Sequence, residues 1–157
     1  REDSVLMETW YTGLFEFDDP DTERERWRRV ISIRDAALKS IERLRIAGDI
    51  GSSLAVDGGV WADGELKEAL GWIGDELRFV LITSEAHVGS LAEAPADAER
   101  VRLDDGEIAI AVDAASGEKC VRCWHRRDDV GRHEAHPELC GRCVENVDGS
   151  GETRRVA

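Results

Sequence analysis

All four cysteines of this 157-residue chain lie in one short window toward its C-terminal end. They form two Cys-x-x-Cys pairs, Cys120 with Cys123 and Cys140 with Cys143, separated by sixteen residues. Each pair can turn back on itself and aim two sulfurs at one point, so two pairs supply the corners of a tetrahedron. This spacing is typical of a structural zinc site with four thiolate ligands.

The small size of the window supports a bound metal. The segment after Gly117 has about 40 residues, too few to build an apolar core of its own. A structural zinc ion contributes about 10–16 kcal/mol to the folding of such a peptide. Four thiolates would leave no open coordination position, so we expect no catalysis at the metal. We therefore expect His125, His133 and His136 to be surface or supporting groups.

Two disulfides, or a redox dithiol, are the alternatives to zinc. Disulfides need an oxidising compartment, and the opening "REDSVLMETWYTG" lacks the basic region and apolar core of an export signal. A redox site needs only one Cys-x-x-Cys pair. We therefore favour zinc and predict a cytoplasmic protein without a membrane span. The start at Arg1 suggests a piece of a longer protein.

Charge limits contact with nucleic acid to local patches. The chain has 34 acidic and 21 basic residues, for a net charge of -13, which on average repels a phosphate backbone. Residues 119–157 differ, because they carry 8 bases and 7 acids, a balance of +1. One Zn2+ with four thiolates would add -2 and leave this region close to neutral.

The cysteine window and its surroundings resemble the C-terminus of bacterial isoleucyl-tRNA synthetase. The matching stretches are "EKCVRCWHRRDDVG", "ELCGRCVENV" and the closing "GSGETRRVA". Upstream, in the same order as in that family, stand "WYTGLF", "IGSSLAV" and "DELRFVLITS". Ala55 and Val56 depart from the family's Glu-Ala. The similarity covers nearly the whole chain, and several ordered motifs are far more specific than a zinc ribbon alone.

This resemblance implies that the full-length protein is an enzyme, which uses ATP to attach isoleucine to its tRNA. The family's His-Ile-Gly-His and Lys-Met-Ser-Lys-Ser motifs are absent from these residues, and "AHVGS" lacks the second histidine. We therefore assign no catalytic residue here and expect ATP to bind in a catalytic domain outside this chain. The editing domain of the family is also absent from these residues. The expected partners are the isoleucine tRNA and the rest of the synthetase, with no DNA or membrane.

Two other functions stay open. The chain could be a free-standing zinc-ribbon adaptor that binds RNA or protein without catalysis. It could also be a module that only buttresses its own enzyme and never touches RNA.

The candidate tRNA-binding residues are mostly arginines, whose planar guanidinium groups suit phosphate. They are Arg126, Arg127, Arg154, Arg155, Trp124 and Arg142. For Trp124 the alternatives are a stacking platform for an unpaired base and a lid packed over the zinc knuckle, which we favour. For Arg142, and also for Arg122, the alternative to RNA is hydrogen bonding to the thiolates or their backbone.

The predicted organisation has three parts. Residues 1–21 form a connecting segment whose aromatic and apolar side chains pack on the domain. Residues 22–118 form a small α+β domain, and residues 119–157 form the zinc-binding module. The apolar side chains of the connecting segment are Trp10, Tyr11, Leu14, Phe15 and Phe17.

Residues 22–47 have apolar positions at helical spacing and predict one long helix. Asp21 or Thr22 is the expected N-cap and Gly48 the stop. The helix begins with four arginines, Arg24, Arg26, Arg28 and Arg29, which could touch phosphate. Because acids interleave with them, we favour a solvated charged face.

The remaining pattern predicts an α+β fold, with the long helix and a short helix against a small β-sheet, followed by a zinc-ribbon or knuckle module. "SLAVDGGVW" predicts a strand interrupted by a bulge or hairpin at Asp57–Gly59. "GELKEALGWIG" predicts a short helix capped by Asp63. "LRFVLIT", residues 77–83, predicts a buried strand, residues 93–100 a polar loop, and residues 106–115 a half-buried strand.

Overall fold

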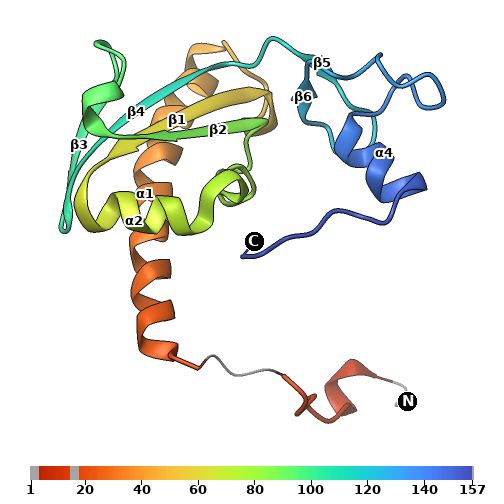
Figure 1. Ribbon diagram of the computed structural model, residues 1–157, viewed down its shortest axis with the longest axis horizontal. Coiled ribbons are helices and arrows are strands. Elements are labelled where there is room, and N and C mark those ends of the chain that lie inside the picture. Colours follow the sequence, from red (N-terminus) through yellow and green to blue (C-terminus); the bar gives the residue numbers. More distant parts are fainter. Residues whose placement is uncertain (1–3, 15–17, 157) are drawn as a thin grey trace.

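A computed structural model of the chain describes residues 4–14 and 18–156. It confirms the α+β class, with helices packed on a small mixed sheet and a separate cysteine-rich module beside one end of that sheet (Figure 1). No helix among the described residues is long and apolar enough to cross a membrane. The domain boundaries at residues 21 and 118 stay predictions.

The long helix is α1, Pro20–Ala47. Its N-cap is Asp19, whose carboxylate accepts a hydrogen bond from the Thr22 amide at 3.2 Å, so the expected caps at Asp21 and Thr22 are wrong. The cap lies earlier because proline, which has no N–H and a fixed φ, fits the first helical position. Gly48 ends the helix as predicted, in a left-handed conformation with φ 86°.

The sheet has four strands in the order β2-β1-β4-β3. The central strand β1 pairs in parallel with β2 on one side and antiparallel with β4 on the other, and β3 pairs antiparallel with β4. The bounds of these strands are Val56–Ala62 for β1, Glu85–Gly89 for β2, Glu99–Leu103 for β3 and Gly106–Ala114 for β4. The parallel pair is possible because α2 and α3 connect β1 to β2.

Strand β1 is continuous through Asp57-Gly58-Gly59, so the predicted hairpin or bulge there is wrong. Gly59 makes room for Trp61 instead. A Cβ atom on Gly59 would lie 2.3 Å from the Trp61 ring, and one on Gly89 of the adjacent strand would lie 2.5 Å from it. The indole therefore lies against two glycines of neighbouring strands, which explains Gly59 in a central strand. Nothing in the structure requires glycine at Gly58, where a Cβ atom would make only ordinary contacts at 3.8 Å.

The connection from β1 to β2 contains α2, Gly64–Ile73, the 3-10 turn η3, Gly74–Glu76, and α3, Leu77–Leu81. Helix α2 is confirmed. Asp63 stands at its N-cap position but makes no capping bond, because its carboxylate accepts from the Leu91 amide at 3.4 Å.

The strand predicted over residues 77–83 is wrong, because this segment is mainly the helix α3. Leu77 and Leu81 lie four residues apart and are both fully buried, whereas Arg78 and Phe79 between them are only partly buried. This is the helical period, which a short apolar run does not distinguish from a buried strand. Ile82 ends the helix in a left-handed conformation with φ 58°.

The remaining elements are short. The loop expected over residues 93–100 gives way to β3 from Glu99 onward. The 3-10 turns are η1, Val5–Met7, η2, Ser53–Ala55, and η4, Leu91–Glu93. The cysteine module contains the two-residue strands β5, Glu118–Lys119, and β6, Arg126–Arg127, and the helix α4, Gly141–Asp148.

The main core lies between the helices and one face of the sheet. Helix α1 runs across that face beside α2 and projects beyond the sheet at its N-terminal end (Figure 1). The core side chains come from α1, β1, α2, α3 and β4, and they are Val30, Ile33, Ala36, Ala37, Val60, Ala62, Leu66, Ala69, Leu70, Ile73, Leu77, Leu81, Ile108 and Ile110.

The connecting segment does not pack as predicted. Trp10, Tyr11 and Leu14 are 93%, 74% and 77% exposed, so their side chains cover little of the domain. Phe15 and Phe17, which belonged to the same expectation, lie outside the described residues.

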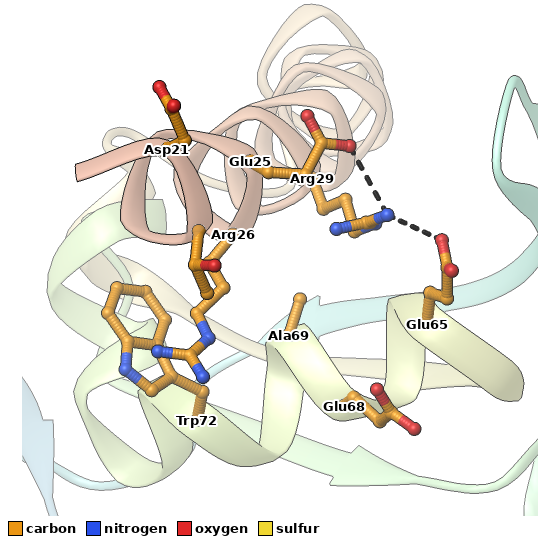
Figure 2. A pocket seen from close by; sticks show the side chains of 9 residues that line it. Asp21, Glu25, Arg26, Arg29, Glu65, Glu68, Ala69 and Trp72 are labelled. Atoms are coloured by element: carbon orange, nitrogen blue, oxygen red, sulfur yellow. Dashed lines mark hydrogen bonds and ion pairs between the residues drawn. The ribbon is translucent and has the colours of Figure 1, made fainter. Parts of the chain in front are cut away.

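A polar cleft of about 440 Å³ lies between the N-terminal half of α1 and α2 (Figure 2). Arg29 crosses it and pairs with Glu65 of α2 at 2.5 Å and with Glu25 at 3.2 Å. The four arginines of this region each contact a carboxylate, in the pairs Arg24–Asp21, Arg26–Glu23, Arg28–Glu25 and Arg29–Glu65. This pairing supports the interpretation as a charged solvated face.

Burial in the core predicts that two isoleucines of α1 contribute very differently to the free energy of unfolding. Ile33 is fully buried, and Ile46 is 75% exposed. We expect Ile33→Ala to lower the free energy of unfolding by about 2–5 kcal/mol, because it leaves a cavity. Ile46→Ala makes the same chemical change on the same helix and should alter it by about 0.5 kcal/mol or less. Equal losses in chemical denaturation would contradict this placement of α1.

Candidate metal centre

The first cysteine pair lies on the turn that joins β5 to β6. The Cys120 amide donates to the His125 carbonyl at 2.9 Å, and the Trp124 amide donates back to the Cys120 carbonyl at 2.9 Å. Trp124 closes this turn with φ 66°, a left-handed conformation that is unusual for tryptophan. The turn thereby directs Cys120 and Cys123 toward the same side.

The second cysteine pair lies at the start of α4. Cys140 is the N-cap of this helix, and Cys143 lies in its first turn and is fully buried. Gly141 between them leaves room for a neighbouring side chain. A Cβ atom there would lie 2.9 Å from the Asp129 carboxylate, which accepts the Gly141 amide at 2.8 Å.

The structure brings the four predicted ligands together. Their sulfur atoms all lie within 4.8 Å of one another, and the Sγ atoms of Cys123 and Cys140 are 3.7 Å apart. A tetrahedron with Zn–S bonds of about 2.3 Å has sulfur–sulfur edges of about 3.8 Å. All four cysteines are free thiols, so the disulfide alternative is not adopted. A set of four sulfurs in this arrangement fits zinc.

The environment favours one thiolate and disfavours another. Burial by itself would raise the pKa of Cys120, but hydrogen bonds from the backbone amides of Cys123, Cys140 and Arg122 lower that pKa to about 6. For Cys123, burial dominates and raises the pKa. Because zinc binds thiolates, metal binding at this site must release protons from buried thiols.

Arg122 supports the sulfur cluster. Its guanidinium Nη1 lies 3.6 Å from the Cys143 sulfur, so it can donate a hydrogen bond to that thiolate and offset part of its negative charge. The Cys140 amide lies 3.4 Å from the Cys120 sulfur and is a second donor. Arg142 makes no hydrogen bond to a sulfur among the described residues, and its Nε and Nη2 donate to Glu152 at 2.6 and 2.8 Å.

The three histidines lie outside the sulfur cluster. His133 has its Nε2 3.7 Å from the Asp129 carboxylate, and His136 bonds to Asp148. His125 is not a surface group, because it is only 8% exposed and its ring lies 6.2 Å from that of Phe79. Burial first, and then the nearby arginines, lower the pKa of His125 and favour its neutral form.

Two of the predicted tRNA-binding arginines hold the module against the sheet. The Arg126 amide donates to the Ser84 hydroxyl at 2.6 Å, and its guanidinium donates to the Gly117 carbonyl at 3.2 Å. Arg127 forms an ion pair with Glu85 of β2 and donates to the Ser84 carbonyl at 3.3 Å. Part of their role is therefore structural.

The arginines of the closing segment are also engaged. Arg154 pairs with Glu152 at 3.0 Å, and its guanidinium lies 3.9 Å from the centre of the Phe79 ring. The Arg155 amide donates to Glu76 of η3 at 2.6 Å. The segment after α4 thus returns to the helical side of the domain (Figure 1).

Trp124 lies at the surface, 59% exposed. Val130 and Leu139 pack against the cysteines instead, so the favoured interpretation of Trp124 as a lid is wrong. The indole lines a cleft of about 420 Å³ between the module and residues 51–55. Lys119 lies in the same cleft with its Nζ 5.2 Å from the indole centre. The predicted tRNA-binding residues do not include Lys119, although its position directly before Cys120 indicates that it belongs to the same turn as Trp124.

The fold and the sulfur cluster define a zinc-finger module of the four-cysteine type on a small α+β domain. Residues 117–146 match a family described as "Zinc finger found in FPG and IleRS". Three curated relatives, all named isoleucine--tRNA ligase, match the chain over nearly its whole length. They are 49% identical over 100% of the chain in Halorhodospira halophila, 50% over 100% in Alkalilimnicola ehrlichii and 49% over 98% in Methylococcus capsulatus.

The predicted resemblance to the C-terminal region of isoleucyl-tRNA synthetase is therefore confirmed, and the chain is homologous over its length to part of the isoleucine–tRNA ligases. It spans about a sixth of the length of these relatives, at 17%, 17% and 16%.

Metal removal should unfold the module selectively. We expect a strong chelator to abolish amide protection over residues 119–156, while the helical signal of α1 persists, because the module has almost no apolar core without the metal. Hydrogen exchange and circular dichroism measure the two effects. An ordered module in metal-free protein would contradict the zinc interpretation.

The hydrogen bond from Arg122 to Cys143 predicts a change in zinc affinity. We expect Arg122→Gln to weaken zinc binding about tenfold, since partners of metal ligands typically contribute that much or more. Arg132 is exposed in the same module, so Arg132→Gln is a control with the same charge change and should have little effect. Competition with a coloured chelator would compare them, and equal affinities would refute the role of Arg122.

Proposed function

We propose that this chain is the zinc-binding, tRNA-positioning portion of an isoleucine–tRNA ligase. The observation that carries the proposal is the homology to such ligases along the whole chain. In the complete enzyme, other parts would use ATP to attach isoleucine to its tRNA. We assign none of that chemistry to the present residues, whose proposed work is to hold the RNA in place.

The four cysteines, Cys120, Cys123, Cys140 and Cys143, would hold one structural Zn2+. The ion, when bound, supplies a fixed tetrahedral anchor and no chemistry, since four thiolates leave no position for substrate. This anchor sets the β5–β6 turn against α4, and it therefore sets where Trp124 and its neighbours stand.

The cleft beside Trp124 is the best-supported RNA contact. An exposed indole, the Lys119 ammonium and the partly exposed Arg126 side chain line it together with the loop of residues 51–55. An aromatic face and two cations suit one unpaired nucleotide, whose base stacks while its phosphate meets the charges. The acidic body, with a net charge of -13, would confine the RNA to such local sites.

The adaptor hypothesis differs from the ligase proposal in one measurable respect. The intact mass of the native gene product should be several times 17 kDa for a ligase, and near 17 kDa for a free-standing adaptor. Charging of isoleucine tRNA by that product would then establish the ligase activity directly. A small product without charging activity would overturn the proposal.

The buttress hypothesis requires variants that leave the module docked. Arg127 is unsuitable because its ion pair with Glu85 joins the module to the sheet. The double variant Lys119→Gln with Arg126→Gln removes two side-chain charges from the cleft. It keeps the Arg126 amide bond to Ser84, which joins the module to the domain, and loses only the guanidinium bond to Gly117. We expect a weaker tRNA affinity and a shallower salt dependence, by about one to two units of slope. An unchanged slope would support a pure buttress.

Trp124 gives the sharpest test of base stacking. We expect Trp124→Ala to weaken binding of the isoleucine tRNA by about 5- to 100-fold, the range for losing one stacked base. Trp124→Phe keeps an aromatic face and should retain most of the affinity. Trp10→Ala removes another exposed indole and should have no effect. Fluorescence anisotropy measures these affinities, and an alanine variant that binds like the original would exclude stacking.

A further inference from the structure

Three guanidinium groups surround the ring of Phe79. Those of Arg78, Arg142 and Arg154 lie 4.9, 5.0 and 3.9 Å from its centre. They come from α3, α4 and the closing segment, so three separate parts of the chain bring positive charge to one place. Like charges gathered around one ring repel one another, and a nearby anion offsets that repulsion.

The anion in this structure is the carboxylate of Glu152. Arg142 donates two bonds to it, at 2.6 and 2.8 Å, and Arg154 donates a third at 3.0 Å. Arg142 and then Arg154 lower the pKa of Glu152 to about 2, against the smaller opposing effect of burial, so it is ionised at neutral pH. A planar guanidinium binds a carboxylate and a phosphate in the same two-pronged way.

One carboxylate does not neutralise this cluster. Burial first, and then the charges of Arg127 and Arg142, lower the pKa of Arg78, and Asp75 and Glu152 oppose this only in part. Of the other acids nearby, Glu85 is paired with Arg127 and also lies 3.8 Å from the Arg78 guanidinium, and Glu76 accepts the backbone amides of the closing segment. Of the three guanidinium groups at Phe79, those of Arg142 and Arg154 thus share Glu152, and that of Arg78 makes a longer contact to Glu85.

Release of the carboxylate requires only the Glu152 side chain to turn away, because the Glu152 amide is held separately by the Asn146 side chain at 3.2 Å. Glu152 follows α4 on a segment that contains Gly149 and Gly151, the latter with φ 88°. The side chains of Glu152 and Arg142 are 23% and 22% exposed, and that of Arg154 is 37% exposed, so solvent already reaches the ion pair. A phosphate group could therefore approach the same donors from outside.

We propose that Arg78, Arg142 and Arg154 form a binding site for a backbone phosphate of RNA, and that Glu152 occupies this site in the RNA-free protein as an internal substitute. The proposal rests on the tRNA-positioning function. It adds a second contact, separate from the Trp124 cleft, and it makes RNA binding an exchange of one anion for another.

The test measures binding of the isoleucine tRNA to the zinc-loaded 157-residue chain at several potassium chloride concentrations. Glu152→Gln removes the internal anion, and Glu134→Gln removes the same charge from an exposed position of the same module. We expect Glu152→Gln to tighten binding about tenfold and Glu134→Gln to tighten it less than about twofold. Adding Arg154→Gln to Glu152→Gln should lower the salt slope by about one unit.

A second measurement needs no variant and no tRNA. Inorganic phosphate is titrated into the original chain while NMR follows the Nε–Hε signals of its arginines. We expect Arg142 and Arg154 to shift with added phosphate, whereas Arg102 of β3, an exposed control, does not. In Glu152→Gln the same shifts should need about tenfold less phosphate.

The outcomes separate this inference from the proposed function. If the chain binds tRNA but Glu152→Gln behaves like Glu134→Gln or binds more weakly, Glu152 is only a structural clasp and the inference is wrong. If phosphate shifts no arginine signal of the cluster, the inference is also wrong. If phosphate binds as expected but no variant binds tRNA, the anion site stands and the proposed function fails.

Discussion

The convergence of four sulfurs is the constraint on which the cysteine module depends. Their Sγ atoms lie within 4.8 Å of one another, and Val130 and Leu139 are the partly buried apolar neighbours that pack against them. So little apolar area cannot offset the conformational entropy of about 40 ordered residues. Zinc, which the sulfur cluster fits, would supply this energy when bound, and the positions of Trp124 and Lys119 would then depend on the ion rather than on a hydrophobic core.

Polar contacts then fix the module against the α+β domain. The buried Ser84 hydroxyl accepts from the Arg126 amide and donates to the Leu54 carbonyl, both at 2.6 Å. Arg127 adds its ion pair with Glu85, and Glu76 holds the closing segment by its amides. Several arginines that look available for RNA in the sequence thus also orient the module. These contacts hold small basic groups at defined places on an acidic protein.

Local patterns predicted the parts of the fold whose physical cause is local. The long helix followed from apolar spacing and from Gly48, and the metal site followed from the cysteine spacing. The prediction failed where contacts with other elements determine the local structure. Residues 77–83 are apolar enough for a strand, but burial of Leu77 and Leu81 against α1 and the sheet selects a helix. The glycines of β1 indicate a turn in the sequence, but Gly59 instead makes room for Trp61, which also lies against Gly89 of the neighbouring strand.

The sequence by itself determined the chemistry of this protein: which residues can bind zinc, which segment forms the long helix, and to which family the chain is related. Those features depend on residue type and on spacing along the chain. Only the tertiary structure decided which charges are available. Glu152 lies ten residues from Arg142 and far in sequence from Arg78, and the cluster around Phe79 exists because three segments meet there. Electrostatic interactions depend on distance in space, and the sequence does not record that distance.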